Sequence, residues 1–284
     1  MVLATDSADT LRKRFEALLT RSDPLPFGEA VAVLMPAAVA RGVAAEPNDS
    51  KRALLVVGSP KTNSPTASSA LGGYLLDRLH DRRWDTESLT LRASLNRAEG
   101  EAALVSSIDR AGLILLVFPL YADALPYLVT KALAVIAAHR QAGGSQSPQR
   151  LVAIVNSGFP ETHQNSVALA ICQEFASQTG ITWAGGLALG GGGIVAGQPL
   201  TATKRSGPSV KHVVRALDLT AEALAAGHSV PAEAVRLMAK TPIPFVPFAL
   251  WRWLYIQLGG KGFERLAAQN GVSKYRLLDQ PYAA

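Results

Sequence analysis

Hydroxyl, amide and ammonium side chains follow the first strongly apolar stretch of the chain. That stretch is Ala53–Val57, and after Gly58 the chain reads SPKTNSPT. Hydroxyls and the free N–H groups at a helix start donate hydrogen bonds to anions, and the helix dipole favours negative charge there. Ser64 followed by Pro65 has the pattern of an N-cap followed by proline at the first helical position. The loop is therefore predicted to bind a phosphate, with a purely structural helix cap as the alternative.

Two common phosphate motifs are weak or absent. A Walker loop requires Gly-x-x-x-x-Gly-Lys-Ser/Thr, and the sequence contains none, which argues against nucleotide hydrolysis. A partial dinucleotide fingerprint lies at Gly191, Gly193 and Ala196, but it runs into Gly197-Gln198-Pro199 and opens no helix. The loop after Gly58 remains the better candidate.

Five stretches rich in β-forming residues alternate with helical patterns along the chain. The expected strands are Ala53–Val57, Ser88–Leu91, Gly112–Leu120, Leu151–Asn156 and Thr182–Leu189. The expected helices are Thr66–Arg83, Glu99–Arg110, Leu125–Arg140, Ser166–Thr179 and Ser209–Ala226. This order predicts an α/β fold, a five-stranded parallel sheet with helices on both faces. Ligands of such sheets bind at the carboxyl ends of the strands.

Two extensions flank this predicted domain. Residues 1–50 form a helical N-terminal extension, residues 51–228 the sheet domain, and residues 229–284 a helical C-terminal extension that is aromatic and basic. A dense aromatic helix is expected within Thr241–Leu258. We expect its aromatic side chains to pack on the sheet domain or on a second subunit. Attachment to an anionic membrane surface is the less favoured alternative.

Composition and charge narrow the functional classes. The 284 residues are 48% hydrophobic and 18% charged, as in a globular protein, and the formal net charge is +6. The excess lies in residues 201–284, which hold 11 Lys and Arg against 5 Asp and Glu. A basic tail is most often simply solvated, and we expect no nucleic-acid partner. No run of about 18 apolar residues predicts a membrane span.

The single cysteine, Cys172, restricts the redox chemistry. One thiol forms no internal disulfide and holds no cysteine-ligated metal or iron–sulfur cluster, so we expect no metal site of that kind. Its position in a predicted helix indicates a buried, unreactive thiol. A reducing compartment is expected, and we predict a cytoplasmic location.

Three loops together resemble those of the NAD(P)H-dependent FMN reductase family of flavodoxin-like proteins. Gly58–Thr66 resembles the family's GSPRxxSxT phosphate loop, and Pro119–Pro126 resembles its PLYxxxxP loop. Asn156–Glu161 is similar to the loop after the fourth strand. The resemblance covers residues 51–284. Lys61 replaces the usual arginine, and Pro65 removes one backbone donor where asparagine is frequent.

The resemblance implies that the protein binds FMN and passes electrons from NAD(P)H to a small acceptor such as a quinone, a flavin or another electrophile. Leu120 and Tyr121 would pack on the isoalloxazine ring, and the N–H groups of Ser157 and Gly158 would face its pyrimidine edge. No acid–base residue is expected, because the cofactor performs the redox chemistry. The expected cofactor-binding residues are Ser59, Lys61, Asn63, Ser64, Thr66, Pro119, Leu120, Tyr121, Ala122, Asn156, Ser157 and Gly158.

Several alternatives stay open at this point. Asp123 is expected to cap the following helix, with contact to the ring edge as its alternative. His163 is expected to be a polar surface residue, with substrate contact as its alternative. We expect a homo-oligomer. The rival functions are a non-enzymatic flavodoxin-like electron carrier and a flavin-free binding or scaffold protein at a membrane surface.

Overall fold

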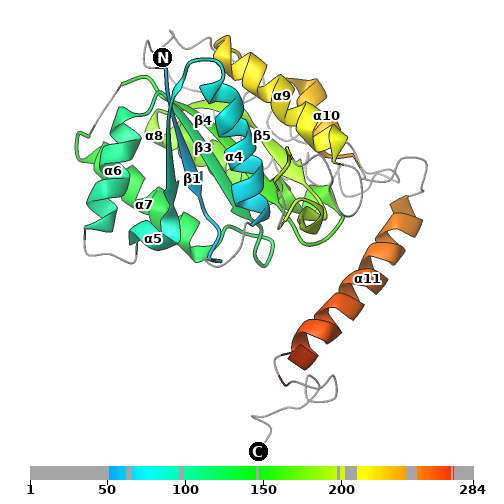
Figure 1. The fold of residues 1–284 in the computed structure, drawn as a ribbon. Helices are drawn as coiled ribbons and strands as arrows, with labels where there is room; N and C mark the ends of the chain where they lie inside the picture. The colour runs from blue at the N-terminus through cyan, green and yellow to red at the C-terminus, as the bar shows by residue number, and fades with distance from the viewer. Residues whose placement is uncertain are drawn as a thin grey trace, which may run out of the picture. The chain divides into compact units, whose positions relative to one another are not determined.

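Apolar side chains with few polar interruptions form the central strands, because a strand covered on both faces has no side that meets water. In the computed structural model the five strands form one parallel sheet in the order β2-β1-β3-β4-β5 (Figure 1). The strands are β1 (Arg52–Val57), β2 (Asp85–Thr90), β3 (Leu113–Pro119), β4 (Arg150–Asn156) and β5 (Thr182–Leu189). The predicted α/β class and five-stranded parallel sheet are confirmed.

The structure describes residues 51–61, 66–95, 99–144, 147–196, 199–201, 210–240, 248–269 and 271. The predicted helical extension over residues 1–50 lies outside the described residues. The same holds for the predicted phosphate-loop residues Asn63 and Ser64.

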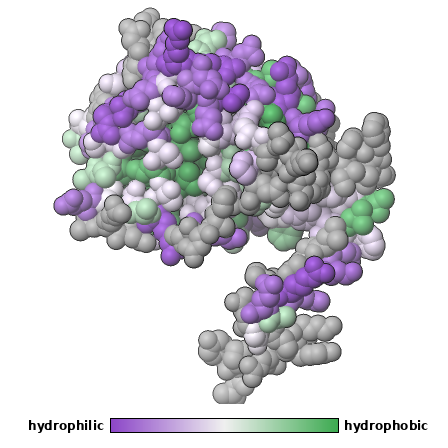
Figure 2. Space-filling view, in the orientation of Figure 1, coloured by the Kyte–Doolittle hydropathy of each residue, from purple (hydrophilic) through white to green (hydrophobic). Residues whose placement is uncertain are grey.

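Helices cover both faces of the sheet, as predicted (Figure 1). One apolar core joins the sheet to α4 (Ala67–His80), α9 (Lys211–Ala225) and α10 (Ala232–Met238). The helices against the other core are α5 (Leu91–Leu95), α6 (Gly100–Arg110), α7 (Tyr127–Gln141) and α8 (Ser166–Thr179). Figure 2 shows hydrophilic residues gathered over the upper part of the sheet unit and a patch of hydrophobic residues below them.

The register of the sheet brings three strand ends together. Val57 of β1 pairs with Val117 of β3, and Pro119 at the end of β3 pairs with Asn156 at the end of β4. The chain passes from β1 to β2 on one side and returns to β3 on the other, so the order of the sheet reverses between β1 and β3. Crevices at such reversals are where α/β sheets bind ligands.

The edge strand β2 differs from the prediction. It spans Asp85–Thr90 instead of Ser88–Leu91, and the residues from Leu91 form α5, which was not predicted. The strand is polar because it lies at the sheet edge, where Arg52 forms ion pairs with Asp85 at 2.9 Å and Glu87 at 2.8 Å. These charges are satisfied across strands, so the strand needs no apolar run.

The C-terminal part divides at residue 241. The first compact unit extends to Lys240 and includes α10, whose Ala234 and Met238 are fully buried in the core. The sequence had placed this stretch in the C-terminal extension, which began at residue 229. The second unit contains α11 (Phe248–Gln269), in which the Trp251 and Tyr255 rings meet edge to face at 5.5 Å. Among the described helices, none has both the length and the apolar character needed to cross a membrane.

The cysteine lies where the sequence predicted. Cys172 is fully buried in α8, among the apolar residues of the second core. Burial raises the pKa of its thiol to about 12, because the thiolate would lose its hydration. The expectation of a buried thiol is confirmed.

Candidate functional site

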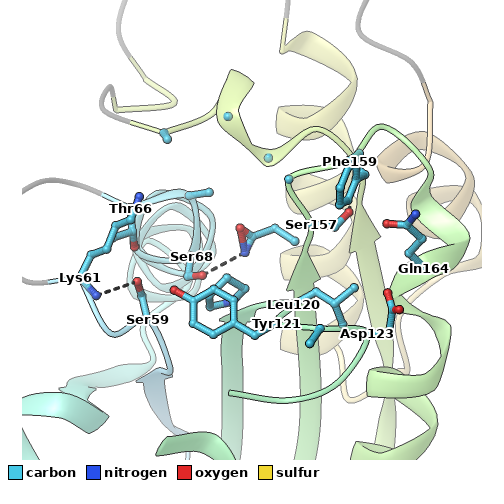
Figure 3. Close-up of a pocket in the computed structure, with 18 residues that line it drawn as sticks. Ser59, Lys61, Thr66, Ser68, Leu120, Tyr121, Asp123, Ser157, Phe159 and Gln164 are labelled. Atoms are coloured by element: carbon cyan, nitrogen blue, oxygen red, sulfur yellow. Dashed lines mark hydrogen bonds between the residues drawn. The ribbon is translucent and has the colours of Figure 1, made fainter. Parts of the chain in front are cut away.

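A cavity of about 710 Å³ opens at the carboxyl ends of β1, β3 and β4. This size lies within the range of about 300–1,000 Å³ that is usual for ligand sites. The described residues that line it are Ser59, Lys61, Thr66, Ala67, Ser68, Pro119, Leu120, Tyr121, Ala122, Asp123, Asn156, Ser157, Gly158, Phe159, Gln164, Gly192, Gly193 and Ala196 (Figure 3). All the predicted cofactor-binding residues that the structure describes are among them.

Polar atoms of the β1–α4 loop form one end of the cavity. The Ser59 side chain is buried, and its Oγ accepts a hydrogen bond of 3.4 Å from the backbone N–H of Lys61 (Figure 3). The Ser59 hydroxyl proton therefore stays available to donate to a ligand. Arg92 of α5 donates to the Pro60 carbonyl at 2.5 Å and holds the loop from outside.

Gly58 lets this loop start close to the neighbouring elements. A Cβ atom at this position would lie 2.4 Å from Cγ2 of Val129 and 2.8 Å from Cβ of Phe118. Both contacts are shorter than packed carbon atoms allow, so a side chain here would displace the loop or its neighbours. The glycine fixes where the polar end begins.

The start of α4 corrects one expectation. The N-cap is Thr66, not Ser64, and Thr66 forms a capping box with Ser69, with bonds of 3.1 Å and 2.8 Å. The reciprocal bonds explain why the helix begins after Thr66. They leave the N–H groups of Ala67 and Ser68 without helical partners, and both residues line the cavity. The first turn of α4 contains no acidic residue, so the positive end of the helix is not neutralised there.

Asn156 holds the back wall together. Its Nδ2 donates to Oγ of Ser68 at 3.0 Å (Figure 3). It also donates to the Phe118 carbonyl at 3.1 Å. These two bonds join α4, β3 and β4. The amide protons of Asn156 are thus used within the protein, although the residue lines the cavity as predicted.

A tight turn after β3 forms the opposite end. Tyr121 and Ala124 exchange two backbone hydrogen bonds of 3.0 Å around Ala122 and Asp123. Both central residues have left-handed backbones, with φ values of 47° and 59°. This is the geometry of a two-residue type I′ turn, which usually contains glycine or asparagine. The turn directs Tyr121 and Asp123 to the cavity.

The structure overturns the expected capping role of Asp123. Helix α7 begins at Tyr127 instead of Leu125, and its N-cap is Pro126, with no side-chain capping bond. The turn at 121–124 separates Asp123 from the helix start. The alternative prediction for Asp123, contact with the ring edge, agrees with its position in the cavity wall.

The loop after β4 corrects a second expectation. The backbone N–H of Ser157 donates to the Leu189 carbonyl at 3.0 Å, so it is not available to a ligand. The Ser157 Oγ donates to the Phe159 carbonyl at 3.1 Å and accepts from Nδ2 of Asn165 at 3.2 Å. These contacts hold the loop and present Gly158, beside which a Cβ would meet open space. Gly158 remains a candidate backbone donor.

A glycine loop after β5 completes the wall, and it was missed as a site element. The N–H groups of Gly191 and Gly192 donate to the carbonyls of Phe159 and Ser157 at 2.7 Å and 2.8 Å. A Cβ on Gly192 would lie 3.1 Å from Oδ1 of Asn156, so a side chain here would require Asn156 or the loop to shift by a few tenths of an ångström. The run of glycines directly after a buried strand was the available signal. The glycine run leads only into a short 3-10 turn, Gly192–Ile194, and not into an α-helix. This agrees with the rejection of the dinucleotide fingerprint, which requires a helix after the glycines.

Four more lining residues were not predicted, namely Ala67, Ser68, Phe159 and Gln164. Gln164 lies on the 3-10 turn η1 (Thr162–Asn165), one residue after His163. His163 is exposed and is not a lining residue, in keeping with its expected role as a polar surface group. The glutamine carried no pattern that distinguishes it from an ordinary helix-start residue.

Comparisons with known proteins give fold-level likenesses only. Neither protein-family models nor curated protein sequences match the chain. Among solved structures, the FMN-dependent NADH-azoreductase of Bacillus anthracis is 14% identical over 61% of this chain and 99% of its own, with a TM-score of 0.43. The NAD(P)H:quinone oxidoreductase of Methanothermobacter marburgensis is 12% identical over 61% and 95%, with a TM-score of 0.45.

A third likeness covers only part of a longer protein. The rubredoxin:oxygen oxidoreductase of Desulfovibrio gigas is 14% identical over 70% of this chain, with a TM-score of 0.43, and the chain spans 39% of its length. The strand order 2-1-3-4-5 with all strands parallel is the deciding observation. The fold is flavodoxin-like. In this flavodoxin-like sheet the cavity lies at the β1/β3 reversal, where the order of strands predicts a ligand.

Proposed function

We propose that the protein binds FMN in this cavity and catalyses electron transfer from NAD(P)H to a small acceptor. One observation carries the proposal: a donor-rich, positively charged end and a flat apolar wall occur in the same cavity of about 710 Å³. FMN has the matching parts, a phosphate monoester joined to a planar ring. Nucleotide hydrolysis has no comparable support, since the chain has no Walker loop.

The polar end suits a phosphate. Ser59 offers a hydroxyl proton, Lys61 a positive charge, and the first turn of α4 the N–H groups of Ala67 and Ser68. Hydrogen bonds to a charged acceptor are stronger than those between neutral groups, and a helix N-terminus adds favourable potential. Thr66 holds this turn in place through its capping box, and its hydroxyl donates to Oγ of Ser69 at 3.1 Å, a bond that a phosphate at this end would replace.

The opposite part suits a planar ring. Leu120 and Tyr121 provide apolar contact area, and the N–H of Gly158 provides a donor at the edge of that surface. When bound, FMN supplies the redox chemistry by taking two electrons from reduced nicotinamide and passing them on. The protein's task is to orient the ring, keep one side of it accessible and donate hydrogen bonds. It needs no general base, because NAD(P)H, a proton and a quinone give NAD(P)⁺ and hydroquinone.

The proposal extends to the setting of the reaction. A single buried thiol and a supply of reduced nicotinamide fit the cytoplasm. A homo-oligomer stays part of the proposal, with the mass of the purified protein by light scattering as its measurement.

Spectroscopy of the purified full-length chain tests the function. We expect it to bind about one FMN per chain, the number that one cavity at one helix N-terminus holds, and to oxidise NADH or NADPH when naphthoquinone is added. Binding of FMN without oxidation of either nicotinamide would make the protein an electron carrier instead. Failure to take up FMN, measured by unchanged fluorescence of the added flavin, would overturn the proposal.

A further inference from the structure

Charge is distributed unequally along the cavity. Among the described residues that line it, Lys61 is the one cation and Asp123 the one carboxylate. Figure 3 shows them on opposite sides, with Ser59 and Thr66 beside Lys61. The cavity is therefore positive at the end proposed for phosphate and negative at the other end.

The backbone of the turn fixes where this carboxylate lies. Two consecutive residues, Ala122 and Asp123, have left-handed φ angles and are closed in by the bonds between Tyr121 and Ala124. Such strained backbone persists only where the surrounding structure imposes it, and it gathers at ligand sites. Aspartate tolerates this conformation better than most residues. The position of Asp123 is thus set by the turn and not by a flexible loop.

Two exposed aromatic side chains line the same cavity as the carboxylate. Tyr121 is 45% exposed and Phe159 is 61% exposed, although both line the cavity. They belong to different loops, after β3 and after β4, so the cavity presents aromatic side chains from two elements. Exposed aromatic surface of this kind stacks on planar ligands, and it attracts cations through the ring faces.

We propose that Asp123 is a specificity-determining residue, which makes the protein favour neutral and cationic planar acceptors over anionic ones. This inference rests on the proposed function and names the acceptor class of the same site. The carboxylate repels an anionic acceptor that binds in the same cavity, and it attracts a cationic one.

The size of the effect follows from Coulomb's law. Two unit charges about 7 Å apart, in a medium between a protein surface and water, change an affinity by about three- to tenfold. Removing the charge of Asp123 should therefore shift the preference between two acceptors of the same shape by that factor. A shift of this size is well within the reach of steady-state kinetics.

The test compares naphthoquinone with its sulfonate on the holoprotein. We expect Asp123→Asn to lower the ratio of kcat/KM for the neutral over the sulfonated quinone by about three- to tenfold. Asparagine also tolerates the left-handed backbone, so the turn is retained. The matched control is Glu222→Gln on the exposed side of α9, which changes the net charge equally but lies outside the cavity wall, and it should leave the ratio unchanged.

A binding measurement separates this inference from the proposed function. Naphthalene sulfonate and naphthyl trimethylammonium, which are not reduced, are titrated against the full-length chain with tryptophan fluorescence as the readout. Asp123→Asn should tighten the sulfonate and weaken the ammonium compound, even if no nicotinamide is oxidised and the proposed function fails. An unchanged ratio in Asp123→Asn, or an equal shift in Glu222→Gln, would overturn the inference.

Discussion

The two ends of the cavity are built in different ways. The end at Ser59 consists of polar groups held by hydrogen bonds between residues close in sequence, from the capping box of Thr66 to the bond between Lys61 and Ser59. The end at Tyr121 has this exposed ring at the start of a turn with two left-handed residues, and a second exposed ring, Phe159, on the loop after β4. The end at Ser59 is suited to a charged group, and the end at Tyr121 is suited to a planar ring. Affinity for the phosphate and affinity for the ring are therefore separable, and riboflavin, which lacks the phosphate, reports on the second end alone.

The largest effect is expected at the polar end. Ser59→Ala should weaken FMN binding by about 1.5–3 kcal/mol, the usual contribution of a hydrogen bond to a charged group. Riboflavin binding should stay the same. Titration of the apoprotein with both flavins, followed by fluorescence, measures the two dissociation constants.

Thr66→Ser serves as the control for this comparison, since serine keeps both the hydroxyl and the cap. It should leave both dissociation constants close to those of the original chain. If Ser59→Ala weakens FMN and riboflavin equally, the polar end does not hold the phosphate, and the contrast between the two ends disappears.

The second prediction concerns a substitution that should displace the whole polar end. Gly58→Ala places a Cβ against Val129 and Phe118 and should lower the free energy of unfolding by about 1–3 kcal/mol, as overpacking does. Displacement of the loop should also weaken FMN more than riboflavin. Urea denaturation and the flavin titration measure the two effects. The matched change at Gly73 on α4, where a Cβ would meet nothing within 4 Å, should not destabilise the protein. Equal stability of the two variants would argue against the close approach at Gly58.

The third prediction addresses the ring end. Tyr121→Ala should weaken FMN and riboflavin by the same amount, about 0.5–1.5 kcal/mol, because a lost ring contact does not depend on the phosphate. Tyr127→Ala is the control, since Tyr127 is 76% exposed and lies outside the cavity wall. A loss confined to FMN would mean that Tyr121 contacts the phosphate and that the two ends have been assigned the wrong way round.

The smallest effect is expected far from both ends, at the sheet edge. Burial alone would raise the pKa of Glu87, but hydrogen bonds from Ser107, Arg52 and Arg110 outweigh it and lower the pKa below the ordinary value of 4.5. A lowered pKa in the folded state means that the ionised carboxylate stabilises the fold. That stability is present above pH 4.5 and is lost as the pH falls through the folded-state pKa.

Glu87→Gln should accordingly lower the free energy of unfolding at pH 7 by about 0.5–1 kcal/mol, as expected for a partly exposed ion-pair network. The difference from the original chain should shrink in acid. Denaturation at pH 7 and pH 3.5 measures it, and both flavin affinities should be unaffected. A deficit that grows in acid would contradict the assigned sign.

The central strands could be predicted closely because their apolar runs are read directly from the sequence. The predicted and observed bounds of β5 agree, those of β1 and β4 differ by one residue at one end, and those of β3 differ by one residue at each end. The bounds of the edge strand β2 were predicted wrongly because its polar residues are paired with Arg52 and Arg110, which are distant in sequence. Such pairing leaves no periodic signal. Helix α10 was not distinguished from the extension that follows, since its packing on α9 depends on the completed sheet.

The loops of the site were predictable in position but not in detail. Hydroxyls after β1 and the tyrosine after β3 stood out, and the structure brings them to one cavity. The sequence Ala122-Asp123 contains no glycine, so nothing indicated a turn with two left-handed residues. The hydrogen bond from the Ser157 N–H to the Leu189 carbonyl could not be predicted either, because it requires knowing that β4 and β5 are neighbours.

The buried thiol of Cys172 gives this protein a reporter of its own opening motions. Burial raises the pKa of this thiol from the ordinary 9.0 to about 12, so the closed state holds far less thiolate than a free thiol at the same pH. A thiol reagent therefore reacts chiefly through conformations in which α8 has moved away from the sheet. The loop of Phe159 and Gln164, which lines the cavity, leads directly into this helix. The rate at which a reagent labels this natural cysteine therefore measures how strongly a bound ligand suppresses the opening of α8.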